Sequence, residues 1–426
     1  MAKITDNPER YALANELHAR PFPSIAAPCR AAYLAIKQPV DAASRDRSAD
    51  REHLLALLRR HGATEPPEGA THYFGQIGKH MLKWESHTEF VTYTVFGEGV
   101  ANPAFDGRTF EMFPADWLET IPGERVTSAL IRVEELGDPA EVPEKLHQWM
   151  VPESLAASWV VDRTAIIAGD FRIDAQGHMR FAVFVQPGTG ARRVGRIVQR
   201  VAEIETYKTM SLLGLPVARM LSKRINEIEE DLTGVVDAMQ GEADKPEKTL
   251  NSLLAIAADL AGLAAQSSFR LGATGAYATL VNQRIEVLRE ERFDGRQTFA
   301  EFMMRRFDPA MRTVTSAEAR LATMSDRATR AANLLRTRVD VDRSAVNQAL
   351  LESMDRRADL QLRLQKTVEG LSVVAISYYA VNLVLYVLAP FAESLQMSKV
   401  EQAALVTPLV VLGVWLAIRR IRNEVE

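Results

Sequence analysis

The chain has 426 residues, of which 51 are Lys or Arg and 55 are Asp or Glu, so its formal net charge at pH 7 is −4. This charge gives no overall argument for a nucleic-acid partner, because such proteins usually carry an excess of basic residues. The single cysteine, Cys29, excludes an intramolecular disulfide and a multi-cysteine metal site.

Residues 1–187 are predicted to form an α+β domain with a mainly antiparallel sheet. Short runs rich in β-branched and aromatic residues alternate in this part with helical runs. The expected strands are 31–37, 72–81, 85–96, 126–133, 159–161, 165–168, and a hairpin of 171–173 with 179–185; the expected helices are 49–61 and 141–150. The first 20 residues contain charges and no apolar core, so we expect no cleavable secretory signal.

Residues 188–308 have a helical periodicity with few helix-breaking residues. We expect one helix over 194–239 and a second over 250–292, antiparallel to the first because the connection is short. Thr298 and Glu301 have the spacing of a capping box, and Asp308 precedes a proline. Both patterns mark helix starts.

Between Pro309 and Pro390 the sequence contains no proline, and its only glycine is Gly370. The pattern predicts an unbroken helix on the order of 120 Å long, with residues 309–370 as a stalk. Apolar residues recur along the stalk at three- and four-residue steps. We expect this stripe to be buried against partner helices, some of them from other subunits: Leu321, Met324, Ala328, Leu335, Val339, Val346, Leu350, Met354, Leu360, Leu364 and Val368.

Two segments near the C-terminus, residues 371–389 and 403–418, contain no Asp, Glu, Lys or Arg. Each approaches the ~20 apolar residues that a helix needs to cross a bilayer, so we expect a transmembrane hairpin with the lipid bilayer as its partner. Basic residues precede the first segment and follow the second, where residues 419–426 form a basic tail. The positive-inside rule therefore places both termini in the cytoplasm.

Four polar residues share one side of the first predicted membrane helix: Ser372, Tyr379, Asn382 and Tyr386. A polar stripe facing lipid is costly, so these residues should face other helices or water. They could line an ion pathway, or they could form hydrogen bonds that hold neighbouring helices together. The residues alone leave both interpretations open.

A strand over residues 83–90 would place Lys83, Glu85, His87 and Glu89 on one face. The two carboxylates and the imidazole could bind a divalent metal cation or supply a general base. The alternative is an ordinary solvated charged face on a strand whose other face, with Trp84 and Phe90, is buried. No His-Glu-x-x-His pattern supports a zinc hydrolase.

Arg20 is a candidate anion-binding residue, together with Lys83, because a guanidinium group can bind a phosphate or a carboxylate through two hydrogen bonds. Arg20 could instead cap the sheet. Residues 188–195 follow a strand and open a helix, as phosphate loops do. Their spacing is neither the dinucleotide fingerprint nor the Walker pattern, so a flexible turn is the alternative.

Four segments carry a resemblance to a known family: NELHARPF at 15–22, KWESHTEF at 83–90, EIETYK at 203–208, and QLRLQKTVEGLSVVAISYY at 361–379. The chain resembles a bacterial family of membrane proteins catalogued as domain of unknown function 3422. This resemblance implies a multi-pass protein of the bacterial inner membrane and names no chemistry.

The order of parts is also similar to that of the CorA-type magnesium transporters, with a cytoplasmic domain, a stalk helix, two membrane helices and a basic tail. This similarity implies a pentamer whose first membrane helix lines a pore. The Gly-Met-Asn signature of those transporters is absent, and the nearest stretch runs from Tyr379 to Asn382 inside the helix. Magnesium selectivity is therefore not implied.

We therefore expect an oligomeric, membrane-anchored protein with a large cytoplasmic domain that conducts or transports a cation. The alternative is a membrane-tethered scaffold or sensor without transport activity. A membrane-anchored, metal-dependent enzyme ranks third, because no catalytic motif stands out in the sequence.

Overall fold

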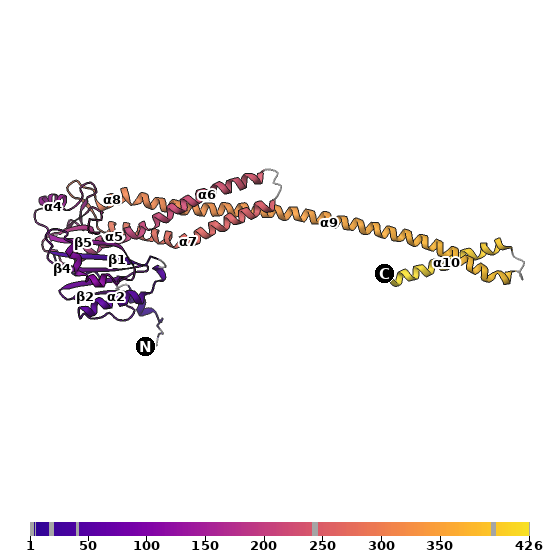
Figure 1. Cartoon of the computed structure of the whole chain (residues 1–426), viewed down its shortest axis with the longest axis horizontal. Helices are drawn as coiled ribbons and strands as arrows, with labels where there is room; N and C mark the ends of the chain where they lie inside the picture. Colours follow the sequence, from indigo (N-terminus) through magenta and orange to yellow (C-terminus); the bar gives the residue numbers. More distant parts are fainter. Residues whose placement is uncertain are drawn as a thin grey trace. The chain divides into compact units, whose positions relative to one another are not determined.

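The computed structural model describes residues 4, 6–16, 21–39, 42–240, 246–392 and 398–425. The chain divides into two compact units, one of Met1–Asp244 with Asn251–Ala331 and the other of Lys245–Leu250 with Ala332–Glu426. A mixed α+β part with one large sheet is followed by long helices (Figure 1). The expected fold class is confirmed at this level.

The sheet has nine strands within the described residues, in the order β2-β3-β4-β1-β5-β8-β7-β6-β9. Neighbouring strands are antiparallel except for β5 and β8, which are parallel. The predicted, mainly antiparallel sheet is therefore confirmed. The strands are β1 Cys29–Lys37, β2 His72–Ile77, β3 His80–Ser86, β4 Phe90–Glu98, β5 Glu124–Glu135, β6 Ala156–Val160, β7 Ala165–Gly169, β8 Met179–Val185 and β9 Glu291–Arg292.

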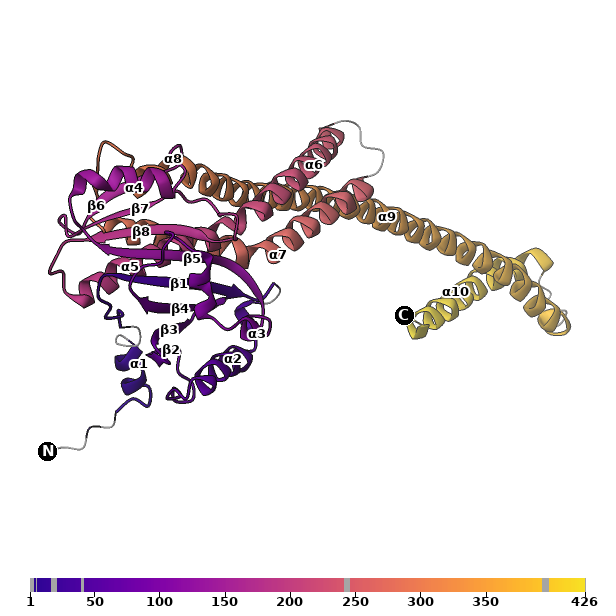
Figure 2. The ribbon, with the colours of Figure 1, turned by 60° about the vertical axis from the view of Figure 1, so that its left-hand side comes forward.

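Helices cover both faces of the sheet, because alternate residues of its central strands are apolar on both sides. On one face Ala31, Tyr33 and Ala35 of β1 belong to a core with α5 (Ala191–Leu212), α7 (Pro246–Glu286) and α8 (Phe299–Arg306). On the other face Ala32 and Leu34 pack with α2 (Arg47–Arg60) and α3 (Ala115–Leu118) (Figure 2). The remaining elements of this part are α1 Arg10–Glu16, α4 Val142–Trp149, and the short 3-10 helices η1 Ala42–Ser44, η2 Gly107–Met112 and η3 Pro139–Glu141.

Three predicted strands differ from the structure, and one of them, 85–96, is interrupted at residues 87–89 between β3 and β4. The expected strand 72–81 is the hairpin of β2 and β3, which turns at Gly78 with a φ of 57°. Phe171, expected in a hairpin with β8, has a φ of 53° and lies outside any strand. Its ring instead packs against Phe299 and Phe302 of α8, and β7 takes the place beside β8.

The helix expected over 194–239 is two helices, because α5 ends at Leu212 and α6 (Gly214–Gln240) begins two residues later. A Cβ atom at Gly214 would lie 2.2 Å from Oγ1 of Thr274 in α7. The break therefore lies where the chain passes close to α7, and only glycine allows this approach. The second expected helix ends at Glu286 instead of 292, because Glu291 and Arg292 pair with β6.

The capping box at Thr298 and Glu301 is present at the start of α8. Helix α9 (Asp308–Ala392) then runs as a single helix of 85 residues, and α10 is Lys399–Val425. Within the described residues α7, α9 and α10 are long and apolar enough to cross a membrane. The sequence analysis identified such segments in α9 and α10 but not in α7.

The apolar stripe of α9 is buried only in its first half. Leu321, Met324, Ala328, Leu335 and Val339 are buried within the single chain. Here Arg320 donates a hydrogen bond to Asn226 of α6 at 2.8 Å. The chain itself therefore covers this half of the stripe, and α6 is the partner helix beside Arg320. The members beyond it are more than half exposed: Val346, Leu350, Met354, Leu360, Leu364 and Val368.

Candidate functional site

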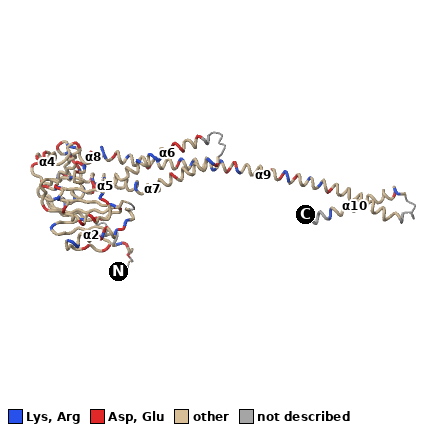
Figure 3. Tube along the Cα trace, in the orientation of Figure 1, with Lys and Arg blue, Asp and Glu red and all other residues tan. Residues whose placement is uncertain are grey.

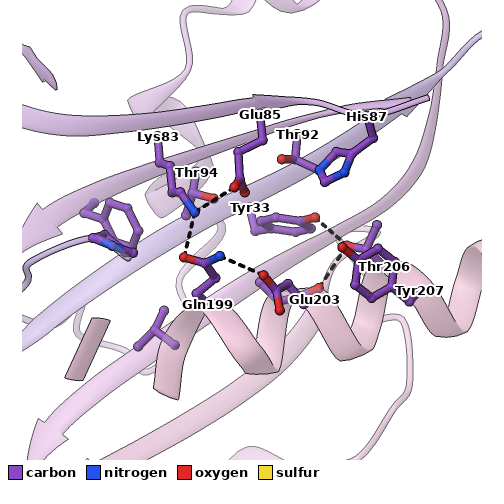
Figure 4. Close-up of a pocket in the computed structure, with 14 residues that line it drawn as sticks. Tyr33, Lys83, Glu85, His87, Thr92, Thr94, Gln199, Glu203, Thr206 and Tyr207 are labelled. Atoms are coloured by element: carbon purple, nitrogen blue, oxygen red, sulfur yellow. Dashed lines mark hydrogen bonds and ion pairs between the residues drawn. The ribbon is translucent and has the colours of Figure 1, made fainter. Parts of the chain in front are cut away.

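A polar pocket lies between the sheet and α5 (Figure 4). Strands β3 and β4 direct alternate side chains towards this helix, and polar positions of α5 face them. The sheet contributes Tyr33, Lys83, Glu85, Thr92 and Thr94, and the helix contributes Gln199, Glu203, Thr206 and Tyr207.

A connected row of charged and polar side chains crosses the pocket. The Lys83 ammonium lies 3.0 Å from Oε1 of Glu85 and donates a hydrogen bond of 2.6 Å to Gln199. Gln199 donates to Oε1 of Glu203 at 2.7 Å, and the other oxygen of Glu203 accepts from Arg284 of α7. Because a buried charge is costly unless it is paired, the alternation of cations and carboxylates stabilises the whole set.

Tyr33 and Thr206 form a second hydrogen-bonded pair across the pocket. The Thr206 hydroxyl donates to the carbonyl oxygen of Ala202 at 2.9 Å, so the Tyr33 hydroxyl must be the donor in its bond to Thr206. Burial raises the pKa of Tyr33 well above its usual value, and the nearby Glu85 carboxylate raises it further. The phenol therefore stays protonated at neutral pH and keeps this bond.

The enclosed part of the pocket has a volume of about 20 Å³, which is room for one water molecule. An adjoining cavity of about 230 Å³ shares Glu85, His87 and Glu203 with it and adds Arg200 and Arg284. Carboxylates and guanidinium groups thus line the same space. A small polar molecule carrying both charges has suitable partners here.

The predicted shared face of Lys83 and Glu85 is confirmed, but the expectation of a solvated charged face is wrong. Lys83 is 4% exposed and Glu85 is 8% exposed. The reason is that α5 covers this face of β3 and supplies Gln199 as a matching polar partner. Trp84 points to the opposite core, as the alternation predicts.

The alternation does not continue to Phe90, because β3 ends at Ser86 and residues 87–89 form a tight turn. The backbone N–H of His87 donates to the carbonyl oxygen of Phe90 at 2.8 Å. After this turn Phe90 lies in the core beside α5 and not with Trp84. The expected common burial of Trp84 and Phe90 on one face is therefore wrong.

The turn also separates Glu89 from the other two candidate metal ligands, Glu85 and His87, which line the same pocket. The His87 ring stacks on Phe90 at 4.3 Å between ring centroids, whereas Glu89 accepts two hydrogen bonds from Arg270 of α7, at 2.7 and 3.0 Å. Glu85 is paired with Lys83. In the part of the chain that the structure describes, no group of three or more His, Cys, Asp or Glu side chains could hold a metal ion.

Of the two candidate anion-binding residues, Arg20 lies outside the described residues. Lys83 is paired as described above. In the segment 188–195, which was compared with phosphate loops, a Cβ atom at Gly195 would lie 1.7 Å from the carbonyl oxygen of Pro23. Glycine at this position therefore allows the backbone of α5 to lie close to the backbone of Pro23.

Sequence reasoning missed Gln199, Glu203, Arg270 and Arg284. Gln199 and Glu203 are four residues apart on the side of α5 that faces the sheet, and polar residues at that spacing beside an apolar face were the available signal. The two arginines belong to α7. No local pattern connects them with β3 or α5.

The four polar residues of the predicted stripe in segment 371–389 differ in how far they are exposed. Ser372 donates to the carbonyl oxygen of Val368 at 2.8 Å. Tyr379 and Tyr386 are 68% and 80% exposed, whereas Asn382 is half-buried. The predicted stripe therefore has an exposed part, with both tyrosines, and a partly covered part.

Of the comparisons with known proteins, the family comparison agrees with the resemblance to the family of unknown function, and none supports the CorA-like order of parts. No curated protein and no solved structure matches the chain. A family profile matches residues 5–425, almost the whole chain. The chain therefore belongs to the family described as protein of unknown function (DUF3422).

Proposed function

We propose that this protein is a membrane-tethered homo-oligomer that holds its α+β domain at the cytoplasmic face of the bacterial inner membrane as a scaffold or sensor. One observation carries the proposal: residues 371–389 and 403–418 contain no charged residue (Figure 3) and lie on exposed helix surfaces. Leu383 is 64% and Leu409 is 66% exposed. An apolar surface of this size in water would favour aggregation, and a bilayer removes that cost.

Helix α7 is the third apolar helix, and its contacts argue against a place in the bilayer. It buries Leu271, Val281 and Ile285, and its Arg270 and Arg284 pair with Glu89 and Glu203 of the α+β domain. These contacts hold α7 against the α+β domain. The bilayer segments are therefore those of α9 and α10, which have several basic residues at their outer flanks and only Lys399 in the connection between them.

The proposed topology predicts that a cysteine at Lys399 is accessible from outside the cell and a cysteine at Ser48 is not. The reason is that the basic flanks of the hairpin hold its ends in the cytoplasm. The measurement is labelling of intact cells with a membrane-impermeant maleimide. The unmodified chain is the control, because Cys29 is 4% exposed and burial raises its pKa to about 12. Labelling at Ser48→Cys but not at Lys399→Cys would reject the topology.

The oligomer follows from the exposed second half of the α9 stripe. Val346, Leu350, Leu364 and Val368 recur on one side of the helix and are each more than half exposed. Helices with such a stripe gain free energy by packing against copies of themselves. The similar order of parts in CorA-type transporters favours a pentamer.

Replacing Leu350 with Asp should shift the detergent-solubilised protein towards smaller assemblies, because a charge in an apolar interface loses its hydration without gaining a partner. The matched control is Leu351→Asp. Leu351 is 65% exposed, against 58% for Leu350, and lies about 100° further round the helix, off the stripe. Native mass spectrometry measures the size of the assembly that each variant forms. A monomeric wild type, or equal effects of the two changes, would contradict the proposed interface.

Cation conduction is the second candidate function, and the exposed part of the polar stripe favours it. Tyr379 and Tyr386 are seven residues apart, and both are exposed. In an oligomer their hydroxyl groups could line a path between copies of the first membrane helix, as in a CorA-like arrangement.

The two candidate functions predict different behaviour of Asn382→Leu. If Asn382 lines a conducting path, the variant should lose cation flux in reconstituted vesicles while its melting temperature stays close to that of the wild type. If Asn382 holds helices together, the variant should lose about 0.6–2 kcal/mol of oligomer stability per hydrogen bond. Absence of flux through the wild type under any cation gradient would leave the scaffold or sensor.

A further inference from the structure

A basic groove lies beside the cavity described above and has a volume of about 770 Å³. Helix α5 contributes Arg193, Arg196 and Arg200, whose spacing of three and four residues places them on one side of the helix. The residues after the end of α7 contribute Arg289, and the turn between β6 and β7 contributes Asp162. All of these belong to one compact unit.

The acidic residues of the groove do not balance its arginines. Arg289 pairs with Asp162 at 2.7 Å, but both side chains are more than half exposed, so this pair is weak. Glu286 is the other acid in the lining. Among the described residues, the side chains of Arg193 and Arg196 have no hydrogen bond and no ion pair, and both residues are exposed.

The excess of positive charge in the groove affects the pKa of Arg200. Its Nη1 donates to the carbonyl oxygen of Val287 at 3.2 Å. Burial lowers the pKa of Arg200, and repulsion by Arg196, Arg284 and Arg289 lowers it further, although Glu203 acts in the opposite direction. A bound anion would remove this repulsion.

The wall of the groove has a strained backbone. Val161 and Asp162 in the β6–β7 turn have φ angles of 52° and 55°, and Arg289 has a φ of 49°. A positive φ is a genuine outlier for a β-branched residue such as valine. Strained residues of this kind gather at ligand sites and switch regions, and here three of them border one cavity.

We propose that this groove binds a phosphate-bearing anion, with Arg193 and Arg196 as its principal ligands and Arg200 at its inner end. Guanidinium groups bind phosphate oxygens through paired, charge-assisted hydrogen bonds. The two arginine side chains without partners carry two positive charges, which suit a phosphate group, either in a soluble anion or in an anionic phospholipid headgroup. This inference goes beyond the proposed membrane tether and does not depend on it, because the groove lies within one unit that contains neither bilayer segment.

The test uses the full chain in nanodiscs and separates the two sources of phosphate. In discs of zwitterionic lipid, calorimetric titration with pyrophosphate measures binding of a soluble anion. In discs containing anionic phospholipid, protection of Arg193 and Arg196 from phenylglyoxal measures binding of a headgroup. Arg196→Gln should weaken either interaction about tenfold. Arg192→Gln is the matched control, since Arg192 is an exposed neighbour that does not line the groove.

Pyrophosphate binding that Arg196→Gln weakens and Arg192→Gln leaves unchanged supports a soluble ligand. Protection by anionic lipid alone, again sensitive to Arg196→Gln, supports a lipid headgroup. The proposal is overturned if wild-type protein shows neither effect, or if an Arg193→Gln/Arg196→Gln double variant behaves as the wild type does. Both substitutions change exposed side chains, so equal melting temperatures of all variants check that folding is intact.

Discussion

Replacement of Lys83 with Met should destabilise the α+β domain by about 3–5 kcal/mol, the usual cost of removing one partner from a buried ion pair. The Lys83 side chain is 5% exposed and that of Glu85 is 10% exposed. Methionine has a similar length and leaves no large cavity, so the loss arises from the unpaired Glu85 carboxylate. Gln199 also loses the donor to its amide oxygen.

Chemical denaturation followed by tryptophan fluorescence measures this loss. The matched control is Lys79→Met, because Lys79 lies in the same hairpin and is exposed. It should change the free energy of unfolding little. Adding Glu85→Gln to Lys83→Met should recover part of the loss, since the unpaired charge is then removed. If Lys83→Met and Lys79→Met had equal stability, the buried network would not stabilise the domain.

Replacement of Gly195 with Ala should destabilise the protein by about 1–3 kcal/mol through overpacking. The new Cβ would lie 1.7 Å from the carbonyl oxygen of Pro23 and 2.7 Å from its carbonyl carbon. These are backbone atoms, which cannot rotate away as the end of a side chain can. The segment that contains Pro23 would have to move away from α5.

Amide hydrogen exchange measures that displacement. Ile25 donates its N–H to the carbonyl oxygen of Ala191 at 3.2 Å, and this amide should exchange faster in Gly195→Ala. The control is Gly234→Ala in α6, where a Cβ atom would meet nothing within 4 Å. This substitution should stabilise the helix by up to about 1 kcal/mol. A Gly195→Ala variant as stable as wild type would show that the two backbones do not meet this closely.

The sheet could be predicted because its signal is local. Short apolar runs with β-branched and aromatic residues, such as 31–37 and 179–185, identify strands without knowledge of the rest of the chain, and β1 and β8 lie where they indicate. Helix ends were harder to place. The break at Gly214 depends on Thr274 of α7, and the end of α7 depends on pairing with β6. Neither partner is near in sequence.

The candidate site could be predicted only in part, for the same reason. Alternation correctly placed Lys83 and Glu85 on one face. It could not show that this face is buried, because the covering residue Gln199 is 116 positions away from Lys83. Arg270 is 181 positions from Glu89. The three-residue turn after β3 also reverses which residues face α5, so the strand pattern could not be extended through it.

The core beneath α5 has a consequence for synthesis of the chain. Phe299, Phe302 and Phe307 share this core with strands from the first 185 residues, and β9 covers the edge strand β6. A nascent chain that ends before residue 307 therefore exposes an incomplete apolar face and an open sheet edge, both of which favour aggregation. The ribosome must deliver about three quarters of the protein before this part can close, and chaperones that bind nascent chains have a long interval in which to act.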